Sequence, residues 1–371
     1  MNKFNNMNKF PSRILSSARD FLASIAVCGA AIAPAHMEAA APSVLAEFPS
    51  DSVVNYHGFP LGADVGWLTE LEAGGEKFFD SEGNQADCMR LLKEECGVNA
   101  IRLRVWVNPE GGWNGKEDVL LKSRRAQQLN LPLMIDFHFS DSWADPSQQR
   151  MPKAWEEYSL PQLTEAVAAH VTDVLSALKE AGIDVKWVQV GNEVPNGMML
   201  PAGAVKDQDS HHFPELFEAG YKASKAVYPD TPVILHIDRG NNEELYTWFF
   251  DLMEKNNVNY DMMGMSFYPW PYDKWEEQTD ELIANIKRVK ERYGKPVMIC
   301  EIGLHYDMDR ECAEMLTRLL DEYKASKSFE GIFYWEPEAP AGYNGGYDKS
   351  CFKEGRPTKA LSPFKNFKPN N

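Results

Sequence analysis

Eight short apolar runs, separated by spacings that leave room for a helix between each pair, constrain this chain more than any other feature of its sequence. Read as strands, they cover residues 61–66, 100–105, 133–137, 187–190, 232–237, 262–267, 297–300 and 331–334. Between them, apolar residues recur at about the 3.6-residue period of an amphipathic helix. One such set is Leu163, Val167, Val171, Val174 and Leu178. Eight alternations of strand and helix predict one α/β domain, a closed parallel (β/α)8 or TIM barrel.

Size and charge agree with a single barrel that carries long loops. The chain has 371 residues, of which 44% are hydrophobic, an ordinary fraction for a globular protein. Its net charge is -17, and the first 35 residues contain four basic side chains and only one acidic one. The remaining chain is therefore still more acidic, which argues against nucleic acid or another anionic polymer as a partner. A neutral ligand is favoured, although the charge could serve solubility alone.

The first 35 residues have the pattern of an export signal. Basic residues precede an apolar run at 21–32, and Ala33-Pro34-Ala35 then supplies a small-x-small cleavage site. We expect a signal peptide at 1–35, an N-terminal extension at 36–59 and the barrel at 60–371, in a secreted or periplasmic protein. Cys28 leaves surface lipoprotein processing open, although Val27 stands where a small residue is usual. No other run reaches the ~18 apolar residues of a membrane span.

Five cysteines remain outside the predicted signal, namely Cys88, Cys96, Cys300, Cys312 and Cys351. An odd number cannot all pair within one monomer. The chain contains no Cys-x-x-Cys motif, so neither a zinc site nor a disulfide framework is indicated. Cys88 and Cys96 are expected on one helix, too far apart to bridge. Most of the five are expected to be buried thiols.

Two glutamates follow predicted strands directly. Glu193 comes after the apolar run that ends at Val190, and Glu301 comes after the run that ends at Cys300. The carboxyl ends of barrel strands form the active-site face, so carboxylates there can face one sugar bond from two sides. Hydrolysis of a glycosidic bond requires such a pair. Asn192, beside Glu193, could hydrogen bond a sugar 2-hydroxyl. Most acidic residues are solvated loop residues, but the position of both glutamates directly after strands favours catalysis.

Six longer blocks then show a family resemblance. They cover residues 97–109, 135–146, 191–193, 236–238, 261–269 and 333–337, in this order and each near a strand end. On these blocks, the chain from about Pro60 to Leu361 resembles the endo-β-1,4-galactanases of glycoside hydrolase family 53. The resemblance implies a retaining hydrolase that cleaves inside β-1,4-galactan, including the arabinogalactan type I of pectin side chains, and acts as a monomer.

The resemblance also implies roles for individual residues. Glu193 matches the acid/base and Glu301 the nucleophile, whose charge the strand-two Arg102 steadies. Arg104 lies two positions after Arg102 and so faces the same side of the strand. It could therefore join the same network around the nucleophile. The other implied substrate-binding residues are His138, Asp141, Trp143, Asn192, His236, Asp238, Tyr268 and Trp335, the last as the floor beneath the sugar. For Trp106, Trp155 and Trp270, core packing and a sugar platform both stay open.

Some features depart from the family or leave alternatives. Leu200 stands before Pro201 where the family often has tryptophan, so one aromatic platform is in doubt. No cofactor is expected; calcium near Asp307, Asp309 and Asp348 is possible, but no twelve-residue calcium loop is present. A retaining barrel acting on β-mannan or β-glucan would share the two glutamates. A non-catalytic glycan-binding protein is the remaining alternative.

Overall fold

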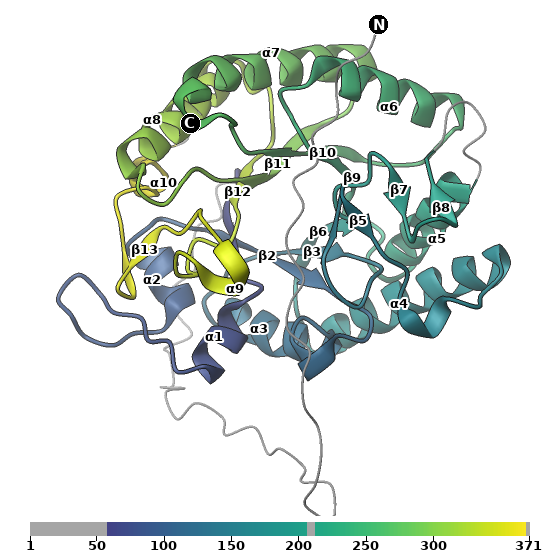
Figure 1. Cartoon of the computed structure of the whole chain (residues 1–371), viewed down its shortest axis with the longest axis horizontal. Coiled ribbons are helices and arrows are strands. Elements are labelled where there is room, and N and C mark those ends of the chain that lie inside the picture. Colours follow the sequence, from purple (N-terminus) through teal and green to yellow (C-terminus); the bar gives the residue numbers. More distant parts are fainter. Residues whose placement is uncertain (1–57, 206–211, 369–371) are drawn as a thin grey trace, which may run out of the picture. The chain divides into compact units, whose positions relative to one another are not determined.

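Eight parallel strands close into a barrel in the computed structural model, which describes residues 58–205 and 212–368 (Figure 1). Around the barrel the strands follow one another in chain order, and the last pairs with the first. They are β1 (Leu61–Asp64), β2 (Ala100–Val105), β3 (Leu133–Phe137), β6 (Val185–Val190), β9 (Val233–Ile237), β10 (Met262–Phe267), β11 (Val297–Ile302) and β12 (Ile332–Tyr334). The predicted (β/α)8 barrel is confirmed. The predicted signal peptide, Cys28 and most of the 36–59 extension lie outside the described residues.

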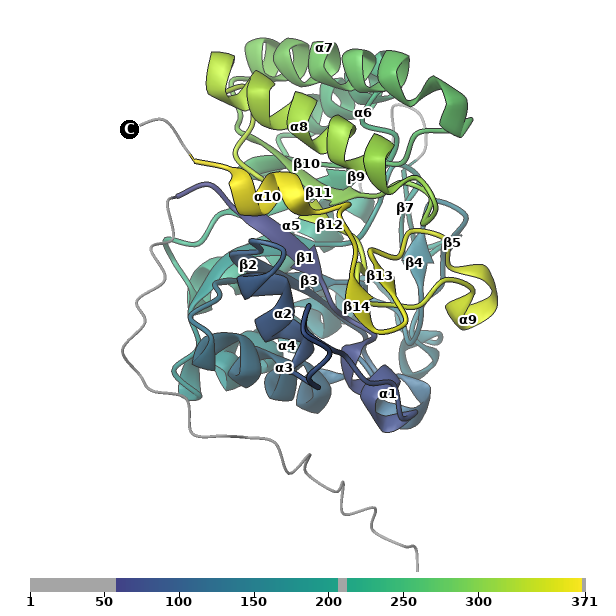
Figure 2. The same ribbon diagram turned by 90° about the vertical axis from the view of Figure 1, so that its left-hand side faces the viewer.

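Helices surround the strands, as the two perpendicular views show (Figures 1 and 2). They are α1 (Leu68–Ala73), α2 (Cys88–Glu94), α3 (Lys116–Gln128), α4 (Leu160–Glu180), α5 (His212–Val227), α6 (Glu243–Lys255), α7 (Trp275–Tyr293), α8 (Asp309–Ser326), α9 (Tyr343–Gly346) and α10 (Ser362–Asn366). Helix α4 begins at a capping box between Ser159 and Gln162, which satisfies backbone donors at its start. Its predicted apolar stripe is buried. Among the described helices, none is long and apolar enough to cross a membrane.

The long segments after the third and fourth barrel strands carry short hairpins. They hold β4 (Ala144–Asp145) with β5 (Gln148–Gln149), and β7 (Gly197–Met198) with β8 (Gly203–Ala204). The two hairpins are joined, because the Leu200 amide donates to the Gln149 carbonyl at 2.7 Å. Further short elements are η1 (Glu110–Gly112), η2 (Lys153–Trp155), η3 (Tyr272–Lys274), β13 (Phe352–Lys353) and β14 (Arg356–Pro357).

The apolar side chains of the barrel strands divide between two separate layers. The larger lies between the strands and the helices, and it contains alternate strand residues such as Ile101, Leu103 and Val105. The smaller plugs the inside of the barrel and consists of Ala100, Met134, Trp187, Ile234, Met262, Met298, Cys300 and Phe333. Successive side chains of a strand point to opposite faces. Two positions beyond Ala100, Met134, Trp187 and Ile234 the strands face inward again, and the residues there are polar and buried: Arg102, Asp136, Gln189 and His236.

Strand β11 departs from regular pairing near its carboxyl end. Its register against β10 shifts so that Ser266 pairs with Glu301, and its pairing with β12 passes from Ile299 directly to Ile302. Ile299 and Ile302 pack in the outer layer, whereas Cys300 belongs to the inner plug. A bulge of this kind lets the consecutive residues Cys300 and Glu301 both face the interior. The strand predicted to end at residue 300 thus continues to Ile302, and Glu301 lies within it.

The cysteine predictions are confirmed in part. All five described cysteines are buried and free. The placement of Cys88 and Cys96 on one helix is wrong, because α2 ends at Glu94 and Gly97 turns the chain with a φ of 80°. A Cβ at Gly97 would meet backbone atoms of Lys365 at 2.4 Å, so this turn requires glycine.

Candidate active site

Arg102 lies at the centre of the polar layer above the apolar plug. Its Nη1 donates to Asp64 at 2.8 Å, and its Nη2 donates to Asp136 at 2.8 Å and to the side-chain oxygen of Asn192 at 2.9 Å. The same Nη2 is 2.9 Å from Oε1 of Glu301. Arg102 is almost fully buried, and a buried charge is tolerated when it is paired in this way. The arginine therefore fixes acidic groups from three other strands around one point.

Glu301 is held on both carboxylate oxygens. Arg102 contacts Oε1, and the Tyr268 hydroxyl donates to Oε2 at 2.7 Å. A guanidinium on one oxygen and a hydroxyl on the other fix the plane of the carboxyl group. Burial and the Glu301 charge in turn raise the pKa of the Tyr268 hydroxyl well above its usual range, so Tyr268 stays a donor. Glu301 is therefore held in one orientation by donors on both of its oxygens.

Glu193 lies in a different environment. It follows β6 with a left-handed backbone, φ 45°, which is uncommon for a non-glycine residue and is found where surrounding structure enforces it. Burial raises the pKa of Glu193 well above its ordinary value, and the negative charge of Glu301 raises it further. A hydrogen bond with Ser266 opposes these effects only in part. Two carboxyl groups with such different surroundings can hold different protonation states.

His236 forms hydrogen bonds that hold the Glu193 backbone in place. Its Nδ1 accepts from the Glu193 amide at 3.4 Å and from the Gln189 side-chain amide at 2.9 Å. Its Nε2 lies 2.8 Å from the Ser266 hydroxyl, and with Nδ1 accepting, Nε2 carries the proton. Burial and the nearby Arg102 charge lower the pKa of His236 well below its ordinary value, so the ring is neutral.

Tryptophans and tyrosines form one wall of the site. The Trp67 ring lies 5.3 Å from Trp143, 5.4 Å from Trp335 and 5.2 Å from Tyr347, each measured between ring centroids. Trp335 directly follows β12 and also approaches Tyr268, at 6.3 Å. The mutual packing fixes the orientation of each ring. An aromatic wall of mutually inclined rings therefore stands beside the two glutamates.

Arg104 lies beneath these rings and is almost fully buried. Its guanidinium carbon is 4.4 Å from the Trp143 ring centroid, 5.2 Å from that of Trp106 and 5.3 Å from that of Trp67. Its Nη1 pairs with Glu336, whose other oxygen accepts from the Trp67 amide at 3.1 Å. The suggested network of Arg102 and Arg104 is present, but Arg104 enters it through their shared partner Asp64, at 3.8 Å. The closest partner of Arg104 is Glu336.

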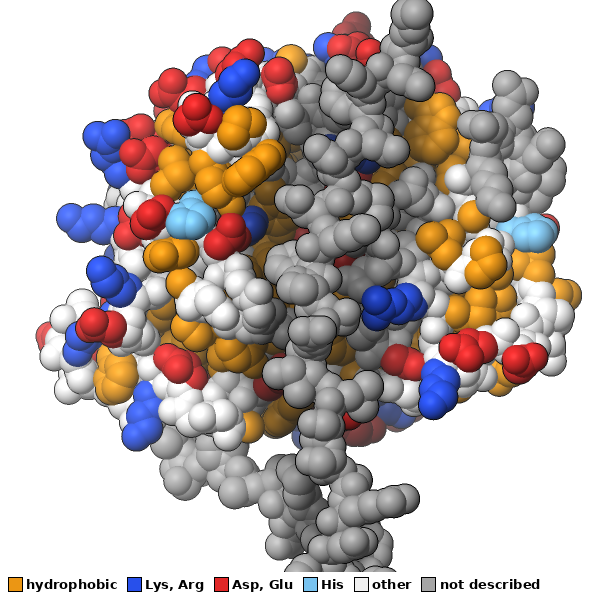
Figure 3. All heavy atoms as spheres, viewed as in Figure 1, with side chains coloured by type: hydrophobic (Ala, Val, Ile, Leu, Met, Phe, Trp, Pro, Cys, Tyr) orange, Lys and Arg blue, Asp and Glu red, His pale blue; other side chains and the backbone are white. Residues whose placement is uncertain are grey.

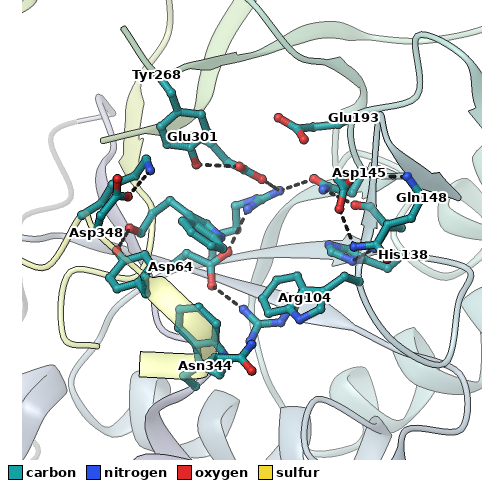
Figure 4. Close-up of a pocket in the computed structure, with 18 of the residues that line it drawn as sticks. Asp64, Arg104, His138, Asp145, Gln148, Glu193, Tyr268, Glu301, Asn344 and Asp348 are labelled. Carbon is teal, nitrogen blue, oxygen red and sulfur yellow. Dashed lines mark hydrogen bonds and ion pairs between the residues drawn. The ribbon is translucent and has the colours of Figure 1, made fainter. Parts of the chain in front are cut away.

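These groups surround a cavity of about 460 Å³ at the carboxyl ends of the strands (Figure 4). Figure 4 shows the carboxyl groups of Glu193 and Glu301 directed into the same space, with Tyr268 beside Glu301. The predicted residues that line the cavity are Arg102, His138, Trp143, Asn192, Glu193, Tyr268, Glu301 and Trp335. A cavity of this size, with apolar walls and a few fixed polar groups, is typical of a small-molecule or oligomer-binding site.

The comparison with known proteins identifies the family. A model described as glycosyl hydrolase family 53 matches residues 60–326, most of the barrel. The chain belongs to glycosyl hydrolase family 53. The predicted family is thereby confirmed.

Relatives and solved structures agree with this family. The chain is 29% identical over 310 residues to the endo-β-1,4-galactanase of Bacillus subtilis (strain 168), which covers 75% of this chain and 70% of that protein. It is 37% identical over 258 residues to a Niallia circulans protein described as uncharacterized, with 68% and 69% covered. The family 53 catalytic domain of Ignisphaera aggregans matches with 27% identity and a TM-score of 0.74 over 86% of this chain and 98% of that one. A fungal β-1,4-galactanase structure matches with 25% identity and a TM-score of 0.73, over 82% and 98%.

Three residues expected at the substrate do not line the cavity of this family 53 protein. His236 is fully buried beneath it. Asp141 accepts from the backbone amides of Asn108 and Lys153, both at 2.9 Å, and so ties two loops together. Asp238 pairs with Arg239 at 2.7 Å. Asn192 lines the cavity, but its side chain is bonded to Arg102 and to the Ala144 carbonyl.

The three uncertain tryptophans have different surroundings. Trp155 is buried in the outer core. The Trp106 indole donates to His138 Nδ1 at 3.2 Å and packs against Trp143, so it supports the wall. Trp270 is exposed.

Several lining residues were not predicted. Asp64 is the last residue of β1, at a position where the alternation of side chains along the strand points into the barrel. This alternation could have predicted that Asp64 lines the cavity. Burial raises the pKa of Asp64 to about 8, and the Glu336 charge adds to this while Arg102 and Arg104 oppose it. Asp145 and Gln148 lie in two-residue strands, Asn344 in the four-residue helix α9, and Asp348 and Lys349 outside any helix or strand; segments this short have no period that marks the inward face.

The acidic residues considered for calcium have other partners. Asp307 contacts His305, Asp309 accepts from the Thr358 hydroxyl at 2.9 Å, and Asp348 pairs with Lys349. Across residues 58–205 and 212–368, no three His, Cys, Asp or Glu side chains gather in a way that could hold a metal ion.

Proposed function

We propose that this protein is an endo-acting, retaining β-1,4-galactanase that cleaves galactan and arabinogalactan type I. One observation carries the mechanism, namely the different surroundings of the two glutamates at one cavity. Arg102 and Tyr268 hold Glu301 as an oriented carboxylate. Burial and the Glu301 charge keep Glu193 protonated. A retaining glycosidase requires a charged nucleophile and a protonated acid at the same bond.

The reaction then follows in two balanced steps. Glu301 attacks the anomeric carbon and forms a glycosyl ester, while Glu193 gives its proton to the departing glycosidic oxygen. In the second step Glu193 takes a proton from water, whose oxygen attacks the same carbon and releases Glu301. When the charge of Glu301 is consumed in the ester, the repulsion that raises the pKa of Glu193 is lost, so that pKa falls and Glu193 stays ionised, ready to accept a proton from water.

The substrate class rests on the relatives and on the aromatic wall. Bacillus subtilis and fungal relatives carry the name endo-β-1,4-galactanase or arabinogalactan endo-β-1,4-galactanase. The axial 4-hydroxyl of galactose leaves one sugar face apolar, and Trp335 offers a ring to such a face. The strongly acidic chain also favours a neutral polysaccharide.

The remaining features of the proposal concern cofactors, assembly and location. Carboxylates and water supply every atom that the two steps transfer, so no cofactor is required. We infer that the protein acts as a monomer. The signal pattern at 1–35 supports export, either as a secreted or periplasmic protein or as a surface lipoprotein processed at Cys28.

A panel of pure polysaccharides tests the proposal. The protein should release short oligosaccharides from unbranched β-1,4-galactan at least a hundredfold faster than from cellulose or mannan, because a site built for one hydroxyl arrangement rejects the epimer. Newly formed reducing ends should keep the β configuration when followed by NMR. Comparable rates on mannan or glucan would contradict the substrate. Binding of galactan without turnover by the wild type, equal to that of Glu301→Gln, would instead establish a glycan-binding protein.

A further inference from the structure

Trp270 is the most exposed of the large hydrophobic side chains in the described chain, at 73%. It follows β10, the strand that precedes Tyr268. Tyr306, also exposed, follows β11, the strand that carries Glu301. On the face seen in Figure 3, hydrophobic side chains gather on the upper left, near the place where Figure 1 draws β11 and α8. The exposed rings of Trp270 and Tyr306 thus follow β10 and β11, the strands that position Tyr268 and Glu301.

Four rings form a continuous series, here called the aromatic ridge: Trp270, Tyr272, His305 and Tyr306. Ring centroids are 5.1 Å apart for Trp270 and Tyr272, 5.3 Å for Tyr272 and His305, and 4.5 Å for His305 and Tyr306. These separations are those of rings in contact. The ridge therefore joins the segments after β10 and β11 into one surface.

The exposed ring of Trp270 is held by a fixed backbone. The Trp270 amide donates to the Gln278 side-chain oxygen at 2.9 Å, and the Gln278 side-chain nitrogen donates to the Pro271 carbonyl at 3.1 Å. Gln278 belongs to α7, so the helix anchors the segment. A rigid exposed ring loses little conformational freedom when a ligand binds, and this suits a binding surface.

Asp348 connects the ridge to the cavity. Its side chain accepts from the Tyr272 hydroxyl at 2.6 Å, and its backbone carbonyl accepts from the Tyr306 amide at 2.7 Å. Asp348 and Lys349 line the cavity, and the Lys349 ammonium lies 5.1 Å from the Tyr268 ring centroid. The ridge residues are not among those that line the cavity, but one residue joins both. A chain leaving the cavity past Asp348 would pass along the ridge.

We propose that the aromatic ridge, with Trp270 as its main contact, binds further sugar residues of the galactan chain outside the cavity. This inference rests on the proposed function. Galactan is the chosen occupant because the ridge continues the substrate cavity, and exposed rings suit the apolar faces of sugars. The acidic character of the chain argues against an anionic membrane surface. The ridge then adds affinity only for substrates long enough to reach it.

Kinetics on substrates of increasing length test this proposal. Trp270→Ala should raise KM for β-1,4-galactan about tenfold, equivalent to about 1.4 kcal/mol, with kcat within about twofold of the wild type. Short galacto-oligosaccharides that fill only the cavity should show unchanged KM and kcat. Trp270→Phe, which keeps an aromatic face, should recover most of the affinity. Trp248→Ala is the matched control, because Trp248 is also exposed, at 41%, but lies on the outer helix α6.

The outcomes separate this proposal from the function on which it rests. Wild-type protein that leaves galactan intact would overturn the proposed function. Wild-type hydrolysis together with an unchanged KM in Trp270→Ala would overturn the ridge alone. An equal rise in KM for the shortest and the longest substrates would also overturn it, since that would mean Trp270 shapes the cavity. Association of two copies that is lost in Trp270→Ala, with unchanged KM, would assign the ridge to another chain.

Discussion

The Tyr268 hydroxyl and Oε2 of Glu301 are 2.7 Å apart, and this contact completes the set of donors around the carboxylate. Tyr268 follows β10 and Glu301 lies in the bulge of the neighbouring β11, so adjacent strands fix the pair. The hydroxyl orients the oxygen that Arg102 does not contact. Loss of the Tyr268 hydroxyl should therefore affect the rate of the catalysed reaction more than the stability of the fold.

Tyr268→Phe should lower kcat by about 10- to 100-fold. This range corresponds to the loss of a hydrogen bond to a charged group, which contributes about 1.5–3 kcal/mol. The melting temperature should change little, because the ring keeps its packing against Trp335. Pre-steady-state kinetics with an activated aryl β-galactoside would measure formation of the glycosyl-enzyme directly. A change in KM without any change in kcat would show that Tyr268 serves binding alone.

Glu193→Ala should slow hydrolysis of galactan by about 10²- to 10⁴-fold, the range of general acid catalysis. Formation of the glycosyl-enzyme from an aryl glycoside with a good leaving group should be far less affected, because that leaving group needs no proton. Glu301→Ala should abolish turnover of both substrates. The comparison needs only steady-state and burst kinetics on two substrates. Equal losses for Glu193→Ala on both would mean that the two roles are assigned the wrong way round.

Glu193→Gln should stabilise the protein at neutral pH. The pKa of Glu193 is raised in the folded state, so between its ordinary value of 4.5 and the folded value the folded protein holds a proton that the unfolded chain releases. Stability therefore falls as pH rises through this window. The neutral amide avoids this loss, and we expect a gain of about 2 kcal/mol, or several degrees in melting temperature, near pH 7. Thermal unfolding from pH 4 to pH 8 should show the gap closing at the acidic end. A gap independent of pH would exclude this linkage.

Two substitutions of Arg104 should distinguish its contribution to folding from its contribution to the geometry of the aromatic wall. Arg104→Met leaves Asp64 and Glu336 buried without this cation, which should cost about 3–5 kcal/mol of stability. Arg104→Lys keeps the charge but loses the planar group that faces Trp143, Trp106 and Trp67. We expect Arg104→Lys to fold, to keep kcat within a few fold and to raise KM for galactan. Tryptophan fluorescence and KM would be measured together, and a drop in kcat with normal KM would contradict this role.

Regular parts of the barrel could be predicted from the sequence. Residues 100–105, 133–137 and 262–267 form strands with the predicted bounds, because apolar β-forming runs end there at clear breaks. Both glutamates lie at the cavity because the barrel brings the carboxyl ends of all strands to one face. The placement of Arg102 follows from alternation along β2.

Other parts depend on tertiary contacts that no periodicity encodes. Arg104 has the parity of Arg102, yet it pairs with Glu336, which lies 232 positions later. Asp141 and Asp238 are polar and near strand ends, but Asp141 accepts from two loop amides and one oxygen of Asp238 pairs with the adjacent Arg239. The bulge at Cys300 depends on pairing with both neighbouring strands, so the end of β11 could not be read from its own residues.

The bulge in β11 also interrupts the backbone pairing beside Glu301. On an uninterrupted ladder, the peptide units on either side of Glu301 would be hydrogen bonded to both neighbouring strands and could shift only together with them. Here the pairing with β12 is interrupted between Ile299 and Ile302, while the outer core holds both isoleucines. We expect the short backbone between them to absorb the displacement from carboxylate to ester and back. The barrel can then remain stationary through the catalytic cycle while one peptide segment flexes.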